Sequence, residues 1–207
     1  MLIDPLKPTI ESQMKAIEWL GSNYIDVGCG PNPLPGAKVY YDVLDWPGID
    51  IYKINFYEEK LPILGNIYCR HVLEDLYYPP ILLDQFKNCE RGYIEIPSIT
   101  VEIVKGVDQH RPWRGFAHHH WFIWEENGTL IFCPKSNVIE HVIETGYVVE
   151  DIPLELFSNI YKWENYNLKY KILYHDINFD IRLENYIMTI YERWKIERDI
   201  WASARQV

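Results

Sequence analysis

The chain has 207 residues, the size of one domain, and its 48% hydrophobic and 24% charged content is that of a globular protein. This composition excludes a disordered chain. Lys and Arg number 20 against 30 Asp and Glu, and the net charge of −10 disfavours a broad phosphate-binding surface, so we expect no nucleic-acid partner.

Helical and extended patterns alternate in the first half of the chain. Apolar residues at helical spacing predict a helix over 9–20, which Gly21 ends. Buried or alternating patterns predict strands at 24–27, 38–42, 50–54, 66–72 and 92–97, with a helix at 80–89. No two-residue hairpin turn joins these strands, so the pattern favours an α/β fold with a parallel sheet.

The pattern changes after Pro97. Residues 98–150 hold most of the histidines and the turn signal Asn127-Gly128, and we interpret them as an insertion that covers the functional edge of the sheet. Residues 157–174 predict a hairpin, and 183–201 predict a helix that would serve as core or as a dimer face. We expect residues 1–207 to form one domain, with a homodimer as an option.

A glycine-rich loop follows the first predicted strand, in the run Asp26-Val27-Gly28-Cys29-Gly30-Pro31-Asn32-Pro33. Gly28 and Gly30 would let the backbone pass close beneath a ligand, and Asp26 would fix the turn or the ligand's amine. The third glycine of a dinucleotide fingerprint is absent, which disfavours NAD and FAD, and no Lys-Ser/Thr ending is present for a P-loop. Taken alone, the loop is equally compatible with a turn that binds nothing.

Two further polar residues follow predicted strands. Asp42 ends the second strand, where a carboxylate can accept hydrogen bonds from both hydroxyls of a ribose. Asn55 follows the third strand, where an amide would pair with an adenine edge. Asp45 and Asp50 are the alternatives to these two residues.

The order of these segments resembles one family. The segments are Asp-Val-Gly-Cys-Gly-Pro-Asn-Pro, Tyr-Tyr-Asp, Pro-Gly-Ile-Asp-Ile, Leu-Pro and His-Val-Leu-Glu-Asp-Leu, within residues 20–100. They resemble the class I S-adenosylmethionine-dependent methyltransferases, and the last is similar to the His-Val-Leu-Glu-His-Leu segment of small-molecule members, with Asp75 in place of the second His. The Ser-Phe-Asp that commonly precedes the fourth strand is missing, which leaves the alignment of residues 55–66 open.

The resemblance implies a Rossmann-like sandwich. It implies a seven-stranded, mostly parallel sheet, a C-terminal antiparallel hairpin at 157–174 and a capping insertion at 98–150. It also implies S-adenosylmethionine as cofactor, with Arg70 and His71 at its methionine side and at the mouth of the acceptor pocket. The implied cofactor-binding residues are Asp26, Gly28, Cys29, Gly30, Asn32, Asp42, Asn55, Arg70 and His71.

The acceptor side is expected in the histidine-rich part of the insertion. Transfer of a methyl group to a hydroxyl needs a base, and a histidine of near-neutral pKa suits that role. In a strand, His118 and His120 would share one face while His119 took the other. The candidate catalytic residues are therefore His118, His119 and His120, with Glu95 as a carboxylate that orients the base. The candidate acceptor-binding residues are Ser98, Asp108, His110, Trp113, Arg114 and Trp121.

Two other interpretations of the histidine run stay open. It would be a surface loop, or it would bind a divalent metal together with Glu95, Glu102 or Asp108. The acidic ligand pattern of metal-assisted methyltransferases is not evident in the sequence, so a metal is not the expected cofactor.

The predicted function is O-methyl transfer to a sugar hydroxyl of a glycan or nucleotide-sugar, because aromatic side chains lie beside the polar groups of the insertion. The alternatives are a methyltransferase for another small metabolite or a nucleobase, and a binding subunit that keeps the cofactor fold without catalysis. The four cysteines form no CxxC pair, and we find no signal peptide and no apolar run of membrane-spanning length. We therefore expect a cytoplasmic protein without a membrane span, acting on a small-molecule or glycan acceptor.

Overall fold

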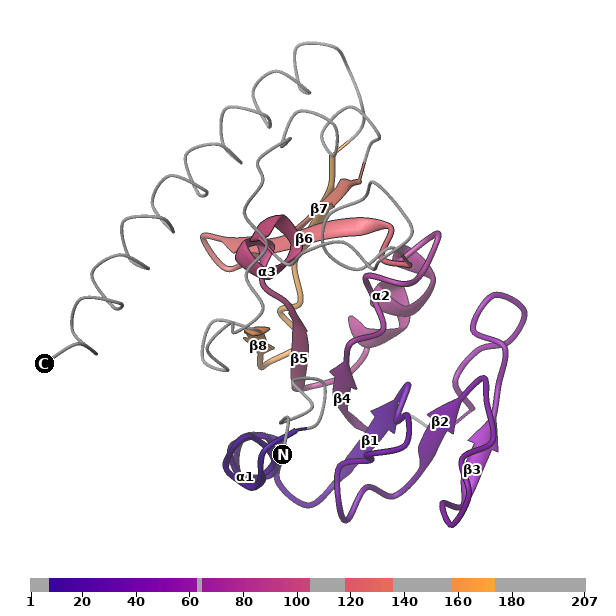
Figure 1. Cartoon of the computed structure of the whole chain (residues 1–207). Helices are drawn as coiled ribbons and strands as arrows, with labels where there is room; N and C mark the ends of the chain where they lie inside the picture. The colour runs from indigo at the N-terminus through magenta and orange to yellow at the C-terminus, as the bar shows by residue number, and fades with distance from the viewer. Residues whose placement is uncertain (1–7, 63–64, 105–117, 136–157, 174–207) are drawn as a thin grey trace, which may run out of the picture.

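A computed structural model describes residues 8–62, 65–104, 118–135 and 158–173 of the chain (Figure 1). The helices are α1 (Ile10–Leu20), α2 (Pro80–Phe86) and α3 (Ile99–Val104). The strands are β1 (Tyr24–Val27), β2 (Tyr40–Asp42), β3 (Ile51–Lys53), β4 (Asn66–Arg70), β5 (Gly92–Pro97), β6 (Trp121–Glu126), β7 (Thr129–Pro134), β8 (Ser158–Trp163) and β9 (Tyr170–Ile172).

The main sheet has six described strands in the order β3-β2-β1-β4-β5-β8. The first five run parallel, and β8 pairs antiparallel with β5. The strand order reverses at β1, since β2 and β3 lie on one side of it and β4 and β5 on the other. The predicted α/β class with a mostly parallel sheet is confirmed. Because open parallel sheets bind ligands where the strand order reverses, a ligand crevice is expected at the carboxyl ends of β1 and its neighbours β2 and β4.

Both faces of the sheet are covered, as a parallel sheet requires. On one face α1 packs Ala16 and Leu20 against Tyr68 and Tyr93. Thr9 begins this helix by accepting a hydrogen bond from the Ser12 N–H, and Gly21 ends it. The larger core lies on the other face, where α2 contributes apolar side chains to a cluster with residues of β1, β4 and β5: Leu82, Leu83, Phe86, Ile25, Ile67 and Ile94.

A second sheet, in the order β6-β7-β9, lies beyond the carboxyl ends of β4 and β5 (Figure 1). Asn127 and Gly128 have φ values of 50° and 74° and join β6 to β7, as the turn signal indicated. The backbone N–H of His120 donates to the Glu74 carbonyl (2.7 Å), and the indole N–H of Trp121 donates to the Leu76 carbonyl (2.6 Å). The described part of 98–150 is therefore docked on the segment that follows β4.

The predicted hairpin over 157–174 is wrong. Its turn forms, with Asn165 and Tyr166 at φ values of 56° and 59°, but its arms enter different sheets. β8 pairs with β5, where Trp163 lies opposite Gly92, and β9 pairs in parallel with β7. The described main sheet consequently has six strands where seven were predicted.

Some predicted elements are shorter in the structure. β4 ends at Arg70 because His71 has a left-handed backbone (φ 51°), and α2 ends at Phe86. β2 and β3 are also shorter than predicted, while β1 and β5 have the predicted bounds. The helix predicted over 183–201 lies outside the described residues. Among the described helices, none has the length and apolar content needed to span a lipid bilayer.

Candidate functional site

The glycine-rich loop after β1 is held by backbone and carboxylate hydrogen bonds. The N–H groups of Gly28 and Cys29 donate to the Tyr41 carbonyl at 2.8 and 3.2 Å. The N–H of Gly30 donates to Asp42 Oδ2 at 2.8 Å, and the N–H of Leu34 donates to Asp26 Oδ2 at 2.7 Å. The two acidic residues thus fix the two halves of the loop at the strand-order reversal.

The two glycines of this loop differ in their surroundings. Both have a left-handed backbone, with φ values of 71° and 56°. A Cβ on Gly28 would lie 2.1 Å from Cγ2 of Val72, so the loop packs directly against the segment after β4. A Cβ on Gly30 would meet no described atom within 4 Å. Gly28 is therefore a packing residue, whereas Gly30 is on the open side of the loop.

Asp26 is buried, and its Oδ1 has no hydrogen-bond partner among the described residues. Burial raises the pKa of Asp26 to about 7, against the opposing effect of the Leu34 N–H, while the charge of Asp42 adds to the increase and Arg70 reduces it. A buried acceptor oxygen without a partner is costly. A ligand donor beside Oδ1 would remove that cost.

Asp42 is also buried, and both of its oxygens accept backbone hydrogen bonds, since Oδ1 takes the Leu44 N–H at 2.9 Å. A carboxylate offers about four lone-pair positions, so it has capacity for further donors. Cys29 lies beside it, with Sγ 3.9 Å from Asp42 Oδ2. Burial, with the charges of Asp26 and Asp42, raises the pKa of the Cys29 thiol to about 12, so the thiol stays neutral.

The remaining cofactor candidates around β2 and β3 are more exposed. Asn55 is exposed, and its Oδ1 accepts the Tyr57 N–H at 3.1 Å in a local turn. Asp45 is exposed and forms an ion pair with Lys53 (2.9 Å), and Asp50 is exposed as well. Of the two candidate ribose carboxylates, only Asp42 contacts the glycine-rich loop in the described structure. Asn32 is half-buried within the loop.

A cluster of charged side chains occupies the carboxyl ends of β4 and β5. Arg70 and Glu95 are register partners, with Arg70 Nε 3.3 Å from Glu95 Oε2. His71 Nδ1 lies 3.0 Å from Oε1 of the buried Glu74, and its Nε2 faces Ser158 Oγ (3.4 Å) and Glu95 Oε1 (3.9 Å). His71 directly precedes Val72, which touches the glycine loop, so this histidine–carboxylate pair adjoins the candidate cofactor loop.

The three consecutive histidines have three environments, and none of them is in a strand, because β6 begins at Trp121. The side chain of His118 is largely exposed, whereas His119 is buried. The ring of His120 stacks on Tyr77 at 4.2 Å between centroids. The prediction that a strand would place His119 on the opposite face from His118 and His120 is therefore wrong, although His119 is buried.

His119 is held by a buried carboxylate. Its Nδ1 lies 2.5 Å from Glu102 Oε1, and Lys135 Nζ lies 2.6 Å from Oε2 of the same residue. Burial would raise the pKa of Glu102, but the hydrogen bond from His119 and the charge of Lys135 outweigh it and hold that pKa below its usual value. This network ties α3 to the start and end of the β6–β7 hairpin.

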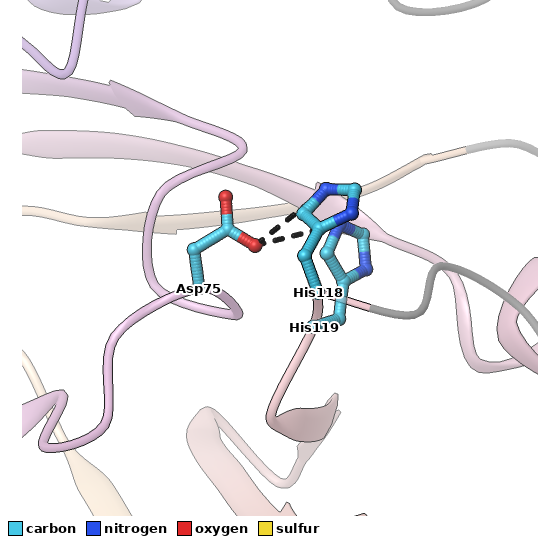
Figure 2. Close-up of side chains that lie close together, drawn as sticks. All are labelled: Asp75, His118 and His119. Carbon is cyan, nitrogen blue, oxygen red and sulfur yellow. Dashed lines mark ion pairs between the residues drawn. The ribbon is translucent and has the colours of Figure 1, made fainter. Parts of the chain in front are cut away.

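His118 and His119 also face Asp75 (Figure 2). Their Nε2 atoms lie 3.8 and 3.7 Å from Asp75 Oδ1. Burial, reinforced by the charge of Glu74, raises the pKa of Asp75 to about 7, and burial lowers the pKa of His118. Burial also lowers the pKa of His120.

The acceptor candidates are only partly described. Glu95 contacts Arg70 and His71, so the histidine beside this carboxylate is His71. Ser98 is buried and its Oγ accepts the Val101 N–H (3.1 Å) at the start of α3. Trp121 lines a hollow of about 430 Å³ together with Tyr78 and Tyr170. The other four candidates lie outside the described residues: Asp108, His110, Trp113 and Arg114.

Sequence reasoning gave no role to several residues of the site, namely Glu74, Asp75, Lys135 and Ser158. The signal for Glu74 was its spacing of three from His71 in a segment already singled out. Lys135 and Ser158 carried no local signal, because folding brings them to residues 33 and 87 positions away.

Comparison with known proteins adds no family assignment: no family model matches the sequence, and no curated protein matches it.

Proposed function

We propose that this protein is an S-adenosylmethionine-dependent O-methyltransferase of the class I type, acting on a sugar hydroxyl of a glycan or nucleotide-sugar. One observation carries the proposal: the Gly28–Gly30 loop, fixed by Asp26 and Asp42, lies where the order of the parallel strands reverses. Open parallel sheets bind ligands in the crevice at this point. The resemblance of residues 20–100 to class I methyltransferases supports S-adenosylmethionine as the ligand.

The residues of the crevice suit this cofactor. Asp26 offers a buried Oδ1 without a described partner, which would accept a hydrogen bond from the cofactor's ammonium group. Asp42 would accept from the ribose hydroxyls with its remaining lone pairs, while it continues to hold Gly30. The open side of Gly30 would leave room for the ligand above the loop. The cofactor, when bound, supplies an electrophilic methyl group on a sulfonium.

The base in this proposal is His71. Glu74 holds its Nδ1, and Nε2 faces the Ser158 hydroxyl at 3.4 Å. An acceptor hydroxyl that took the place of the Ser158 hydroxyl would give its proton to Nε2. His71 also adjoins the cofactor loop through Val72. The histidines at 118–120 are the competing candidates, and they lie against Asp75, Glu102 and Tyr77.

The sugar acceptor is supported by the aromatic hollow beside this segment. Tyr78, Trp121 and Tyr170 contribute rings to it, and the Trp121 indole is hydrogen-bonded to Leu76 in the segment that begins at His71. Aromatic faces present large apolar surfaces to ligands. A flat nucleobase or another metabolite would also fit such rings, so the acceptor assay must include these classes.

The test is transfer of a labelled methyl group from S-adenosylmethionine to a panel of sugars, nucleotide-sugars, nucleobases and phenols. We expect turnover with a sugar acceptor, and His71→Gln should reduce it by about 10²- to 10⁴-fold while the affinity for S-adenosylhomocysteine stays unchanged. Full activity in His71→Gln, with loss in His118→Gln, His119→Gln or His120→Gln, would move the base to the histidine run. Cofactor binding without turnover on any class would favour the non-catalytic binding subunit.

A further inference from the structure

We propose that Asp75, His118 and His119 form a binding site for a divalent transition-metal ion of the Zn²⁺ type (Figure 2). The three ligands are not among the residues assigned above to the cofactor, and the proposal does not depend on methyl transfer. The ligands differ from those considered in the sequence analysis. Asp75 supplies the carboxylate ligand, and Glu102 contacts the ligand His119 without being a ligand itself.

The distances between the three ligand atoms suit one ion. Asp75 Oδ1 is 3.7 Å from Nε2 of His119 and 3.8 Å from Nε2 of His118, and all three atoms lie within 4.8 Å of one another. Ligands at about 2.0–2.1 Å from a tetrahedral Zn²⁺ are roughly 3.3 Å apart. These separations would therefore have to shorten by a few tenths of an ångström to about 1.5 Å for the three atoms to coordinate one ion. The side chains of Asp75 and His118 are only partly buried, which leaves room for that adjustment.

Glu102 gives His119 the support that metal-binding histidines usually have. Its Oε1 lies 2.5 Å from Nδ1 of His119, so the proton of the neutral ring is on Nδ1 and the lone pair of Nε2 points toward Asp75. A carboxylate that accepts from the far ring nitrogen orients a metal-bound histidine and raises its basicity. Lys135 holds the other oxygen of Glu102, which fixes this support in the buried network.

A simple ion pair accounts less well for the same geometry. The distance of 3.7 Å between His119 Nε2 and Asp75 Oδ1 is longer than the about 2.7–3.2 Å of an N–H···O hydrogen bond, so these two atoms are not hydrogen-bonded to each other. Among the described residues, the carboxyl groups of Glu74, Asp75 and Glu102 lie near this site; His71 contacts Glu74, and Lys135 contacts Glu102. This balance of charged groups favours a cation at the site.

The ligand types select the class of metal. Two imidazole nitrogens and one carboxylate oxygen suit Zn²⁺, Fe²⁺ or Co²⁺, whereas Mg²⁺ and Ca²⁺ prefer oxygen ligands. Three protein ligands also leave at least one coordination position for water or another ligand.

The test is metal binding by the full chain, prepared without a histidine tag and freed of metal with a chelator. Zn²⁺ alone is titrated by calorimetry, and Co²⁺ is followed by its visible absorption. We expect one equivalent of each ion to bind. Asp75→Asn and His118→Gln should each weaken binding by tenfold or more, and Glu102→Gln, which acts through His119, by about 10- to 100-fold.

His120→Gln is the matched control, because His120 belongs to the same run but stacks on Tyr77. It should bind Zn²⁺ as the unmodified chain does. Thermal unfolding of each metal-free variant checks that the fold is kept. The His118 side chain is largely exposed, so His118→Gln is the variant expected to disturb the fold least. The absence of stoichiometric binding, or equal affinity in His118→Gln, Asp75→Asn and the unmodified chain, would overturn the metal site. S-adenosylhomocysteine binding is measured separately, so failure of the metal site and failure of the proposed function remain distinguishable.

Discussion

Gly28 and Gly30 have similar backbone angles but are expected to respond differently to a methyl group. At both positions an alanine would pay about 1–2 kcal/mol for its left-handed backbone. At Gly28 it would also collide with Val72 at 2.1 Å, and overpacking adds about 1–3 kcal/mol. At Gly30 no described atom is near, so only the backbone cost applies.

We predict that Gly28→Ala lowers the free energy of unfolding by about 2–5 kcal/mol and Gly30→Ala by about 1–2 kcal/mol, as measured by urea denaturation. Adding Val72→Ala should recover part of the loss in Gly28→Ala, since it removes the colliding methyl group. Equal losses at the two glycines, or no recovery in the double variant, would contradict the close packing of the loop on Val72.

Asp26 predicts a specific dependence of stability on pH. The pKa of this carboxyl is about 7 in the folded chain and 3.8 in its ordinary state. Between these values the folded chain keeps a proton that the unfolded chain has lost, so the free energy of unfolding falls as pH rises from about 4 to about 7. Above about pH 7 both states are ionised, and this contribution stays constant.

Asp26→Asn cannot ionise and should lack this contribution. We predict that its stability relative to the unmodified chain improves between about pH 4 and about pH 7, by up to about 1.4 kcal/mol per pH unit, in urea titrations at several pH values. Asp45→Asn, at an exposed carboxylate, controls for the loss of one negative charge. A stability difference for Asp26→Asn that does not change with pH would refute the buried, protonated carboxyl.

At the scale of elements, the pairing of β5 with β8 depends on a position without a side chain. A Cβ on Gly92 would lie 1.8 Å from the ring of Trp163, its partner in the antiparallel register. The Trp163 ring is buried, stacks on Phe86, and donates its indole N–H to the Cys89 carbonyl at 3.2 Å. The indole therefore covers Gly92 and joins β8 to the α2–β5 connection.

We predict that Gly92→Ala lowers the free energy of unfolding by about 1–3 kcal/mol, because the indole must move. In a Trp163→Leu background the same change should cost at least about 1 kcal/mol less, since a smaller side chain lies opposite. Urea denaturation of the four proteins in this double-mutant cycle measures the difference. Strictly additive effects would be inconsistent with the contact.

The limits of sequence interpretation are clearest at β8 and β9. The patterns at 157–174 indicated two strands, and the turn between them forms, but an alternating pattern does not specify a partner. In the structure, β8 pairs with β5 and β9 pairs with β7, so the two predicted arms do not pair with each other. In contrast, β1 and β5 were predictable to the residue. Each is a short, mostly apolar segment, and glycine or proline marks its limits: Gly28 follows β1, and Gly92 and Pro97 are the ends of β5.

For the whole molecule, the predictable part of the site was the part encoded in consecutive residues. The contacts of Asp26, Gly28, Gly30 and Asp42 follow from short segments after neighbouring strands, and the structure brings these residues together. The run His118–His120 stood out as a candidate site because three consecutive histidines are unusual. Glu102 was one of three acidic candidates for a metal shared with this run, but its actual contacts were not predictable. Glu102 reaches His119, and Lys135 reaches Glu102, only when α3 meets the two ends of the β6–β7 hairpin.

The central claim is that the crevice at β1 and β2 binds S-adenosylmethionine through Asp42. Calorimetric titration with S-adenosylhomocysteine and S-adenosylmethionine tests it most directly, using the unmodified chain, Asp42→Asn, and Asp45→Asn as the matched control. Loss of a hydrogen bond to a charged group costs about 1.5–3 kcal/mol, which is about tenfold or more in affinity. We predict micromolar binding by the unmodified chain and by Asp45→Asn, and at least tenfold weaker binding by Asp42→Asn. Failure of the unmodified chain to bind either ligand would contradict the account.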